Sequence, residues 1–113
     1  MLKLILYAML LQSYSPTPEQ YTCTAYCPCT QCNSGYTLSY HGTTLNKGII
    51  AADPQVLPLN SILYIPGYGF GIVHDTGGAI KNNRLDLCYA THEKALQFGR
   101  QQKKAYMIVR GRQ

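Results

Sequence analysis

Three aspartates are the residues of this sequence best suited to chemistry. Asp53, Asp75 and Asp86 all lie in the middle of the chain, beside glycine, proline or apolar residues. A glycine-rich bend joins Asp75 to Asp86, so two strands could bring both carboxyls to one end of a barrel, and Asp53 could reach the same rim. Carboxyls around exposed backbone suit proton transfer to and from an electron-rich oxygen. The alternative is structural: Asp53 caps a turn, and Asp75 binds N–H groups of the bend.

The bend after Asp75 is the candidate binding segment. Two adjacent glycines let the backbone approach a ligand closely and leave N–H donors that no side chain obstructs. The residues expected to bind substrate are Thr76, Gly77, Gly78, Ala79 and Lys81. Lys81 and Arg84 could meet carboxylates of a ligand, although solvated surface positions explain both residues equally well.

Five cysteines form a second candidate site. Four of them crowd together, as Cys23, Cys27, Cys29 and Cys32. In an oxidising compartment Cys27 or Cys29 could pair with Cys32, although five cysteines leave one unpaired. Three or four thiolates, with His41 as a further ligand, could instead hold a structural zinc ion, and free thiols are the third alternative. In each case we expect a structural role, and the aspartate chemistry requires no cofactor.

The composition indicates one globular domain. The chain has 113 residues, of which 46% are apolar and only 13% are charged, which argues against a long disordered or coiled-coil segment. The net charge is +5, with basic residues gathered near the C-terminus. Because aromatic and basic residues do not interleave there, we expect a solvated basic face rather than a nucleic-acid site. We also expect a monomer.

The N-terminal segment, residues 1–20, predicts export. One early lysine precedes the apolar run Leu4–Leu11, and small residues follow at Ser13 and Ser15, as in a signal peptide or short anchor. A truncated start is the alternative. The run is too short for a transmembrane helix, which needs about twenty residues. A Ser- and Pro-rich linker then leads into a domain expected over residues 21–113.

The remaining pattern predicts an all-β fold. Short runs of β-forming residues alternate with Gly, Pro and Asn turns. Strands are expected over residues 21–26, 48–52, 62–65, 70–74, 84–89 and 104–109. One helix is expected over residues 91–98, because Thr91 can cap it and Gly99 can end it. Six short strands and one helix suggest a small closed barrel.

Several segments together resemble a known family. They are Thr24–Cys29, Ala51–Pro54, Leu57–Leu59, Tyr64–Gly69, His74–Lys81, Arg84–Leu87 and His92–Phe98. In this order they resemble the 3D (three-aspartate) domain of bacterial cell-wall proteins, which is related to the barrel of MltA-type lytic transglycosylases. One departure is Asn82, where family members often carry glycine; asparagine tolerates the same left-handed backbone.

The resemblance implies a double-psi β-barrel, secretion to the bacterial cell wall, and peptidoglycan glycan strands as substrate. It implies cleavage between N-acetylmuramic acid and N-acetylglucosamine, with 1,6-anhydro-N-acetylmuramic acid formed. The three family aspartates fall on Asp53, Asp75 and Asp86, with Asp86 as the catalytic acid and base. Such a reaction needs no attacking water, so one carboxyl can act twice. We expect Asp75 to raise the pKa of Asp86 and Asp53 to orient the sugar or hold the bend.

Two other functions are consistent with the sequence. An expansin-like barrel could bind cell-wall glycan without cleaving it. Alternatively, Ile72–Gly77 could be the active-site triplet of a dimeric aspartic protease. Against the protease, the triplet runs into Gly78, and Ile108-Val109 is followed by Arg110 rather than by glycine.

Overall fold

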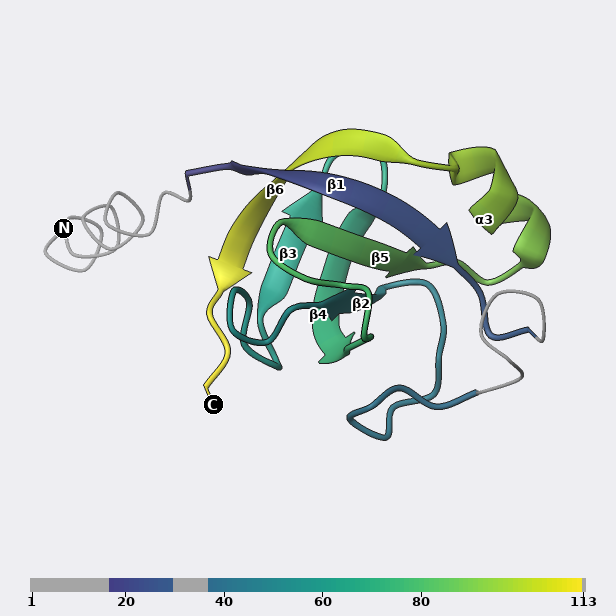
Figure 1. Ribbon diagram of the computed structural model, residues 1–113, viewed down its shortest axis with the longest axis horizontal. Coiled ribbons are helices and arrows are strands. Elements are labelled where there is room, and N and C mark those ends of the chain that lie inside the picture. The colour runs from purple at the N-terminus through teal and green to yellow at the C-terminus, as the bar shows by residue number, and fades with distance from the viewer. Residues whose placement is uncertain (1–16, 30–36, 113) are drawn as a thin grey trace, which may run out of the picture.

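The computed structural model describes residues 17–29 and 37–112, and in these ranges the chain forms six strands and one helix. The elements are β1 (Glu19–Tyr26), β2 (Ile49–Ala52), β3 (Ile62–Ile65), β4 (Gly69–Asp75), β5 (Arg84–Cys88), α3 (His92–Phe98) and β6 (Gln101–Val109). The strands close into a barrel in the order β1-β5-β2-β4-β3-β6 (Figure 1). The predicted all-β barrel with one short helix is therefore confirmed.

The barrel mixes parallel and antiparallel pairs. β1 with β5 and β2 with β4 are parallel, and the other four pairs are antiparallel. β1 and β6, the longest strands, run side by side along one edge in Figure 1, with α3 at their end. The parallel pairs β1–β5 and β2–β4 are joined by the antiparallel pair β5–β2. On that side of the barrel, strands that are distant in sequence are therefore neighbours.

Alternation along the strands fills the barrel interior with apolar side chains. The interior cluster contains Cys23 of β1, Ile50 of β2, Val73 of β4, and Leu85 and Leu87 of β5, all fully buried. A second cluster lies outside the barrel wall, where Tyr26, Leu45, Ile49, Ala51, Ile80 and Cys88 pack together. The loops that precede β2 and follow β4 contribute Leu45 and Ile80, so they cover this outer face.

The predicted element positions agree closely with the structure. The strand expected over residues 62–65 has those bounds, whereas β1 and β6 begin earlier than expected, at Glu19 and Gln101. Thr91 caps α3 by accepting a hydrogen bond from the Lys94 N–H at 3.2 Å, and Gly99 ends the helix with φ 66°. β1 thus begins inside the segment expected to be a linker.

Most of the expected signal-like segment lies outside the described residues. Cys32 also lies outside them. Within the described ranges, no helix has the length and apolar character that crossing a bilayer requires.

Candidate active site

Asp75 and Asp86 lie on either side of β2, at the level of one alanine. In the strand register Ala51 pairs with Asp86 of β5 and with Asp75 of β4. Ala51 belongs to the outer cluster, and residues at one level of a sheet point to the same face. The small alanine side chain therefore separates two carboxyls on the outer face of the barrel.

A β-bulge brings Asp75 to this face. Val73, two residues earlier, points into the barrel interior, and simple alternation would place Asp75 there as well. The register instead passes from Ile50–Val73 to Ala51–Asp75, so β4 has one extra residue, His74, against β2. Such bulges re-aim a side chain, and here the bulge turns the Asp75 carboxyl toward the outer cluster.

Asp86 is a half-buried carboxyl held by β1. The Thr24 hydroxyl donates a hydrogen bond to Asp86 Oδ1 at 3.1 Å, and Thr24 is the register partner of Asp86. In the described part of the chain Asp86 Oδ2 accepts no protein hydrogen bond. This second oxygen is therefore available to a substrate.

The pKa of Asp86 is raised above its ordinary value. Burial is the largest cause, the Thr24 hydrogen bond and the Arg84 charge act in the opposite direction, and the Asp75 charge raises the pKa further. The sequence predicted that Asp75 raises the pKa of Asp86, and this is confirmed. Removal from water is the larger cause and outweighs repulsion between the carboxyls.

Asp75 is fixed through both of its oxygens. The Tyr26 hydroxyl donates to Oδ2 at 2.9 Å, while the N–H groups of Tyr40 and Thr76 donate to Oδ1 at 2.9 and 3.0 Å. Burial and then the neighbouring Asp75 charge raise the pKa of Tyr26, so its hydroxyl stays protonated and remains a donor. These three hydrogen bonds hold the Asp75 carboxylate in one orientation.

Asp53 plays the structural role that the sequence left open. It is 7% exposed, and its oxygens accept hydrogen bonds from the Gln55 and Asn82 N–H groups, each at 3.0 Å. These bonds lower the pKa of Asp53 and tie the turn after β2 to the turn before β5. Asn82 has φ 58°, the left-handed backbone expected where family members carry glycine. Asp53 therefore holds the bend.

The bend after Asp75 lies over the outer cluster. Its anchor is Ile80, which is 7% exposed and packs with Ala51 and Tyr26. The Ile80 N–H donates to the Gly77 carbonyl at 3.0 Å, and Arg84 Nη1 donates to the Ala79 carbonyl at 3.2 Å. Gly78 has open space where a Cβ would stand. The bend is thus held beside the carboxyls, with Thr76, Gly77, Gly78, Ala79 and Lys81 along it.

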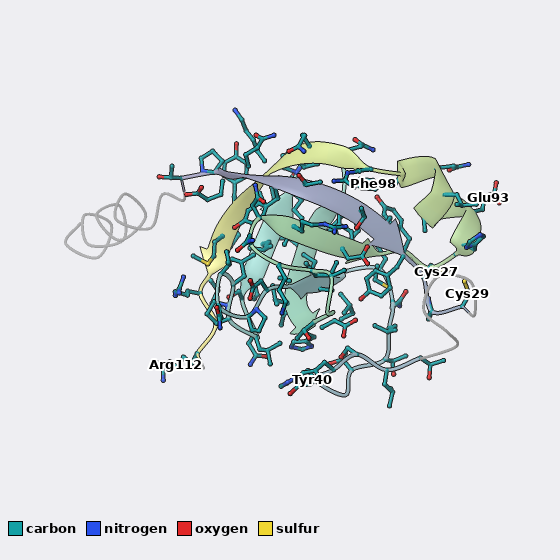
Figure 2. The ribbon with its side chains drawn as sticks, in the orientation of Figure 1. Cys27, Cys29, Tyr40, Glu93, Phe98 and Arg112 are labelled. Carbon is teal, nitrogen blue, oxygen red and sulfur yellow. The ribbon has the colours of Figure 1, made fainter. Side chains whose placement is uncertain are left out.

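The loop before β2 forms the other border of the site. The Tyr40 side chain is 75% exposed although its backbone N–H binds Asp75, and Figure 2 shows it at the outer edge of the molecule. Next to it the His41 ring packs against the His74 ring at 4.6 Å between centroids. His41 therefore belongs to this loop.

Of the cysteines expected to form one cluster, Cys23 lies apart from Cys27 and Cys29. Cys23 is fully buried in the barrel interior, where burial raises its thiol pKa to about 11. Cys27 Sγ and Cys29 Sγ lie 2.9 Å apart, and Cys29 Sγ lies 3.7 Å from His92 Nδ1. His92, rather than the expected His41, faces these cysteines.

Thr24, Tyr26 and Tyr40 were not singled out from the sequence. Thr24 and Tyr26 stand in a segment that carries the family resemblance, Thr24–Cys29, and they alternate in the strand so that both face outward. Only the fold brings these three residues to the carboxyls, because their partners lie 62, 49 and 35 positions away in the sequence.

Comparison with known proteins identifies the family. Residues 48–109 match the model of the 3D domain, and this range holds all three aspartates and the bend. The chain belongs to the 3D domain family. The cell wall-binding protein YocH of Bacillus subtilis (strain 168) is 44% identical over 62 residues, 51% of this chain and 22% of YocH. The SPbeta prophage-derived protein YorM of the same organism is 35% identical over 97 residues, 82% of this chain and 41% of YorM.

This 3D domain thus spans less than half the length of either relative. Among solved structures, the lytic transglycosylase MltA from Escherichia coli matches with a TM-score of 0.56 at 16% identity. The match covers 66% of this chain and 28% of MltA. At this identity the match establishes a shared fold, and activity has to be argued from the carboxyls.

Proposed function

We propose that this 3D domain is a peptidoglycan lytic transglycosylase in which Asp86 is the general acid and base. One observation carries the proposal: a half-buried carboxyl with a raised pKa and a free Oδ2 faces a second, hydrogen-bonded carboxyl across Ala51. The lytic transglycosylase fold of MltA supports the choice of reaction. An acid whose pKa is raised toward neutrality keeps a usable fraction of its protons at the pH of reaction.

In the first step, protonated Asp86 gives its proton from Oδ2 to the oxygen that links N-acetylmuramic acid to N-acetylglucosamine. The bond from this oxygen to the anomeric carbon breaks, and positive charge develops on the muramic acid ring. In the second step, the 6-hydroxyl of the same ring attacks the anomeric carbon and gives its proton to the Asp86 carboxylate. The products are a free N-acetylglucosamine hydroxyl and a 1,6-anhydro ring, and no water is consumed.

Asp75 stabilises the charged intermediate state in this proposal. Three donors hold its carboxylate in one orientation, and a fixed negative charge beside a developing positive charge lowers the barrier without reorganisation. The Thr24 hydroxyl keeps Asp86 Oδ1 occupied, so the proton is presented on Oδ2. Asp53 contributes indirectly by positioning the bend.

The glycan strand would lie across the outer face, between the bend and the Tyr40 loop. The open backbone at Gly78 and the exposed Tyr40 ring offer hydrogen bonds and an aromatic surface to a sugar chain. A substrate in the cell wall requires an exported protein, and the name of YocH, a cell wall-binding protein, is consistent with that location. We propose that the domain works there as a monomer.

A glycan-binding module without catalysis is the second candidate. The observation that favours it is the name of YocH, which describes binding rather than cleavage. A peptide substrate, as in an aspartic protease, is less well supported, because the family match includes the Asp75 segment itself.

Digestion of purified peptidoglycan separates these functions. The proposal predicts muropeptides that end in 1,6-anhydro-N-acetylmuramic acid, identified by mass spectrometry as lighter than hydrolysis products by one water. Reducing ends would indicate a hydrolase instead. Co-sedimentation with the wall without soluble products would indicate a binding module, and cleaved peptides inhibited by pepstatin would indicate a protease.

A further inference from the structure

A cluster of metal-ligating atoms lies outside the carboxyl site. Cys27 Sγ, Cys29 Sγ and a ring nitrogen of His92 lie within 4.8 Å of one another. Cys27 and Cys29 follow the end of β1, and His92 is the first residue of α3, far away in sequence. Figure 2 shows the two cysteines together just below α3.

The donor set is the one that zinc prefers. Thiolate sulfur and imidazole nitrogen are its usual ligands, in tetrahedral geometry. With bonds of about 2.3 Å to sulfur and 2.0–2.1 Å to nitrogen, a sulfur and a nitrogen on one zinc ion lie about 3.6 Å apart. Cys29 Sγ and His92 Nδ1 lie 3.7 Å apart. Two such sulfurs would lie about 3.8 Å apart, so the 2.9 Å between the cysteine sulfurs must lengthen by rotation of one side chain.

We propose that Cys27, Cys29 and His92 bind a single zinc ion that joins the end of β1 to the start of α3. Two thiolates and a neutral imidazole balance the charge of Zn²⁺, and metal binding releases the two thiol protons. Among the described residues these three supply ligands, and a water or a further donor would complete the tetrahedral set.

The zinc ion would stabilise the end of β1, which carries two residues that bind the carboxyls. Cys27 directly follows Tyr26, whose hydroxyl binds Asp75, and Thr24 of the same strand binds Asp86. The Tyr26 carbonyl accepts a hydrogen bond from the Tyr89 N–H at 2.7 Å. Fixing the chain at Cys27 and Cys29 therefore limits the motion of the strand end that orients both carboxyls.

A disulfide between Cys27 and Cys29 is the competing chemistry. The two sulfurs are close, but a disulfide does not use the imidazole that lies 3.7 Å from Cys29 Sγ, whereas zinc uses all three groups. The presence of His92 beside the thiols is therefore the observation that distinguishes the two.

Metal analysis of the purified protein tests the proposal without any assay of glycan cleavage. Protein made with zinc and kept reduced should carry about one zinc per chain, and Co²⁺ in its place should give a thiolate-to-cobalt charge-transfer absorption. Removal of the metal with a strong chelator should lower the melting temperature, and zinc should restore it. His92→Gln and Cys29→Ser should each lose most of the metal.

Matched controls use the residues that the sequence suggested but the structure places elsewhere. His41→Gln and Cys23→Ala should keep wild-type metal content, because neither side chain belongs to the cluster. If Cys29→Ser does not fold, His92→Gln and the cobalt spectrum of the wild-type protein still decide. Wild-type metal content in His92→Gln, or a metal-free protein whose peptide mass map shows a Cys27–Cys29 disulfide, would overturn the proposal.

Discussion

Asp75 and Asp86 are partners of the same residue, Ala51, from opposite sides of β2. This relationship depends on the bulge at His74, because without it Asp75 would follow Val73 into the barrel interior. The two carboxyls differ in surroundings: three donors hold Asp75, whereas among the described residues the Thr24 hydroxyl is the single donor to the Asp86 carboxyl. That difference supports the proposal that Asp86 carries the proton and that Asp75 stabilises the developing positive charge.

Thr24→Val should shift the pH dependence of catalysis upward. The Thr24 hydroxyl stabilises the charged form of Asp86 and so lowers its pKa; its removal therefore raises that pKa. Since the first step needs protonated Asp86, kcat/KM falls as pH rises through this pKa, and in the variant the fall should occur at higher pH. Thr22→Val, on the same strand but bonded to Gln102, is the control with an unchanged profile. A shift toward lower pH would contradict the assignment.

Asp86→Asn should stabilise the folded protein at neutral pH. Because the pKa of Asp86 is raised in the fold, the folded state binds more protons than the unfolded chain, and stability is lost as pH rises through the raised pKa. Asparagine does not ionise, so the variant does not lose this stability as pH rises. Thermal unfolding should show a higher melting temperature for the variant near neutral pH, and the gap should close below the ordinary aspartate pKa of 3.8. Equal melting temperatures at neutral pH would show that burial does not disfavour the ionised form of this carboxyl.

Asp53→Asn should have the opposite effect. The pKa of Asp53 is lowered by its two backbone hydrogen bonds, so its contribution is present above the ordinary value and is lost as pH falls through the lowered pKa. Asparagine has a single acceptor oxygen and cannot replace both bonds. We expect a melting temperature lower by roughly 5 °C at neutral pH, with the difference shrinking in acid. A pH-independent difference would mean that the carboxylate charge is unimportant.

Gly78→Ala should weaken glycan binding without harming the fold. A Cβ at Gly78 meets no atom within 4 Å, so the barrel should tolerate it, but the methyl group would stand where substrate approaches the bend. We expect KM to rise severalfold while the melting temperature stays unchanged. Gly71→Ala is the contrasting control, since its Cβ would lie 2.5 Å from Ile50 Cδ1 and overpacking costs about 1–3 kcal/mol. An unchanged KM for Gly78→Ala would remove the bend from the binding site.

The elements of this fold could be predicted because their signals are local. Alternating β-formers, the Thr91 cap and the Gly99 stop lie within a few residues of the elements that they define. The first residues of β6 were not predicted from the sequence. Gln101 and Gln102 are exposed and polar, so no apolar pattern marks them as part of a strand. Hydrophobic periodicity cannot reveal such positions, since pairing with β1 forms them.

The parts of the site that the sequence could not reveal depend on long-range register. The extra residue in β4 shows only when the strand is paired with β2, and it decides which face receives Asp75. Burial, which mainly raises the pKa of Asp86, likewise arises from packing. For the cysteines, the sequence suggested His41 as a further ligand, and only the fold places His92 beside Cys29.

The central claim is that the Asp86 carboxyl carries the proton of the reaction. The most direct test digests purified peptidoglycan with the wild-type protein and with folded Asp86→Asn, and compares the muropeptides by mass spectrometry. We predict that the wild-type protein releases 1,6-anhydro products and that Asp86→Asn releases none while still binding the wall. Release of anhydro products by Asp86→Asn would contradict the account and move the acid role to Asp75.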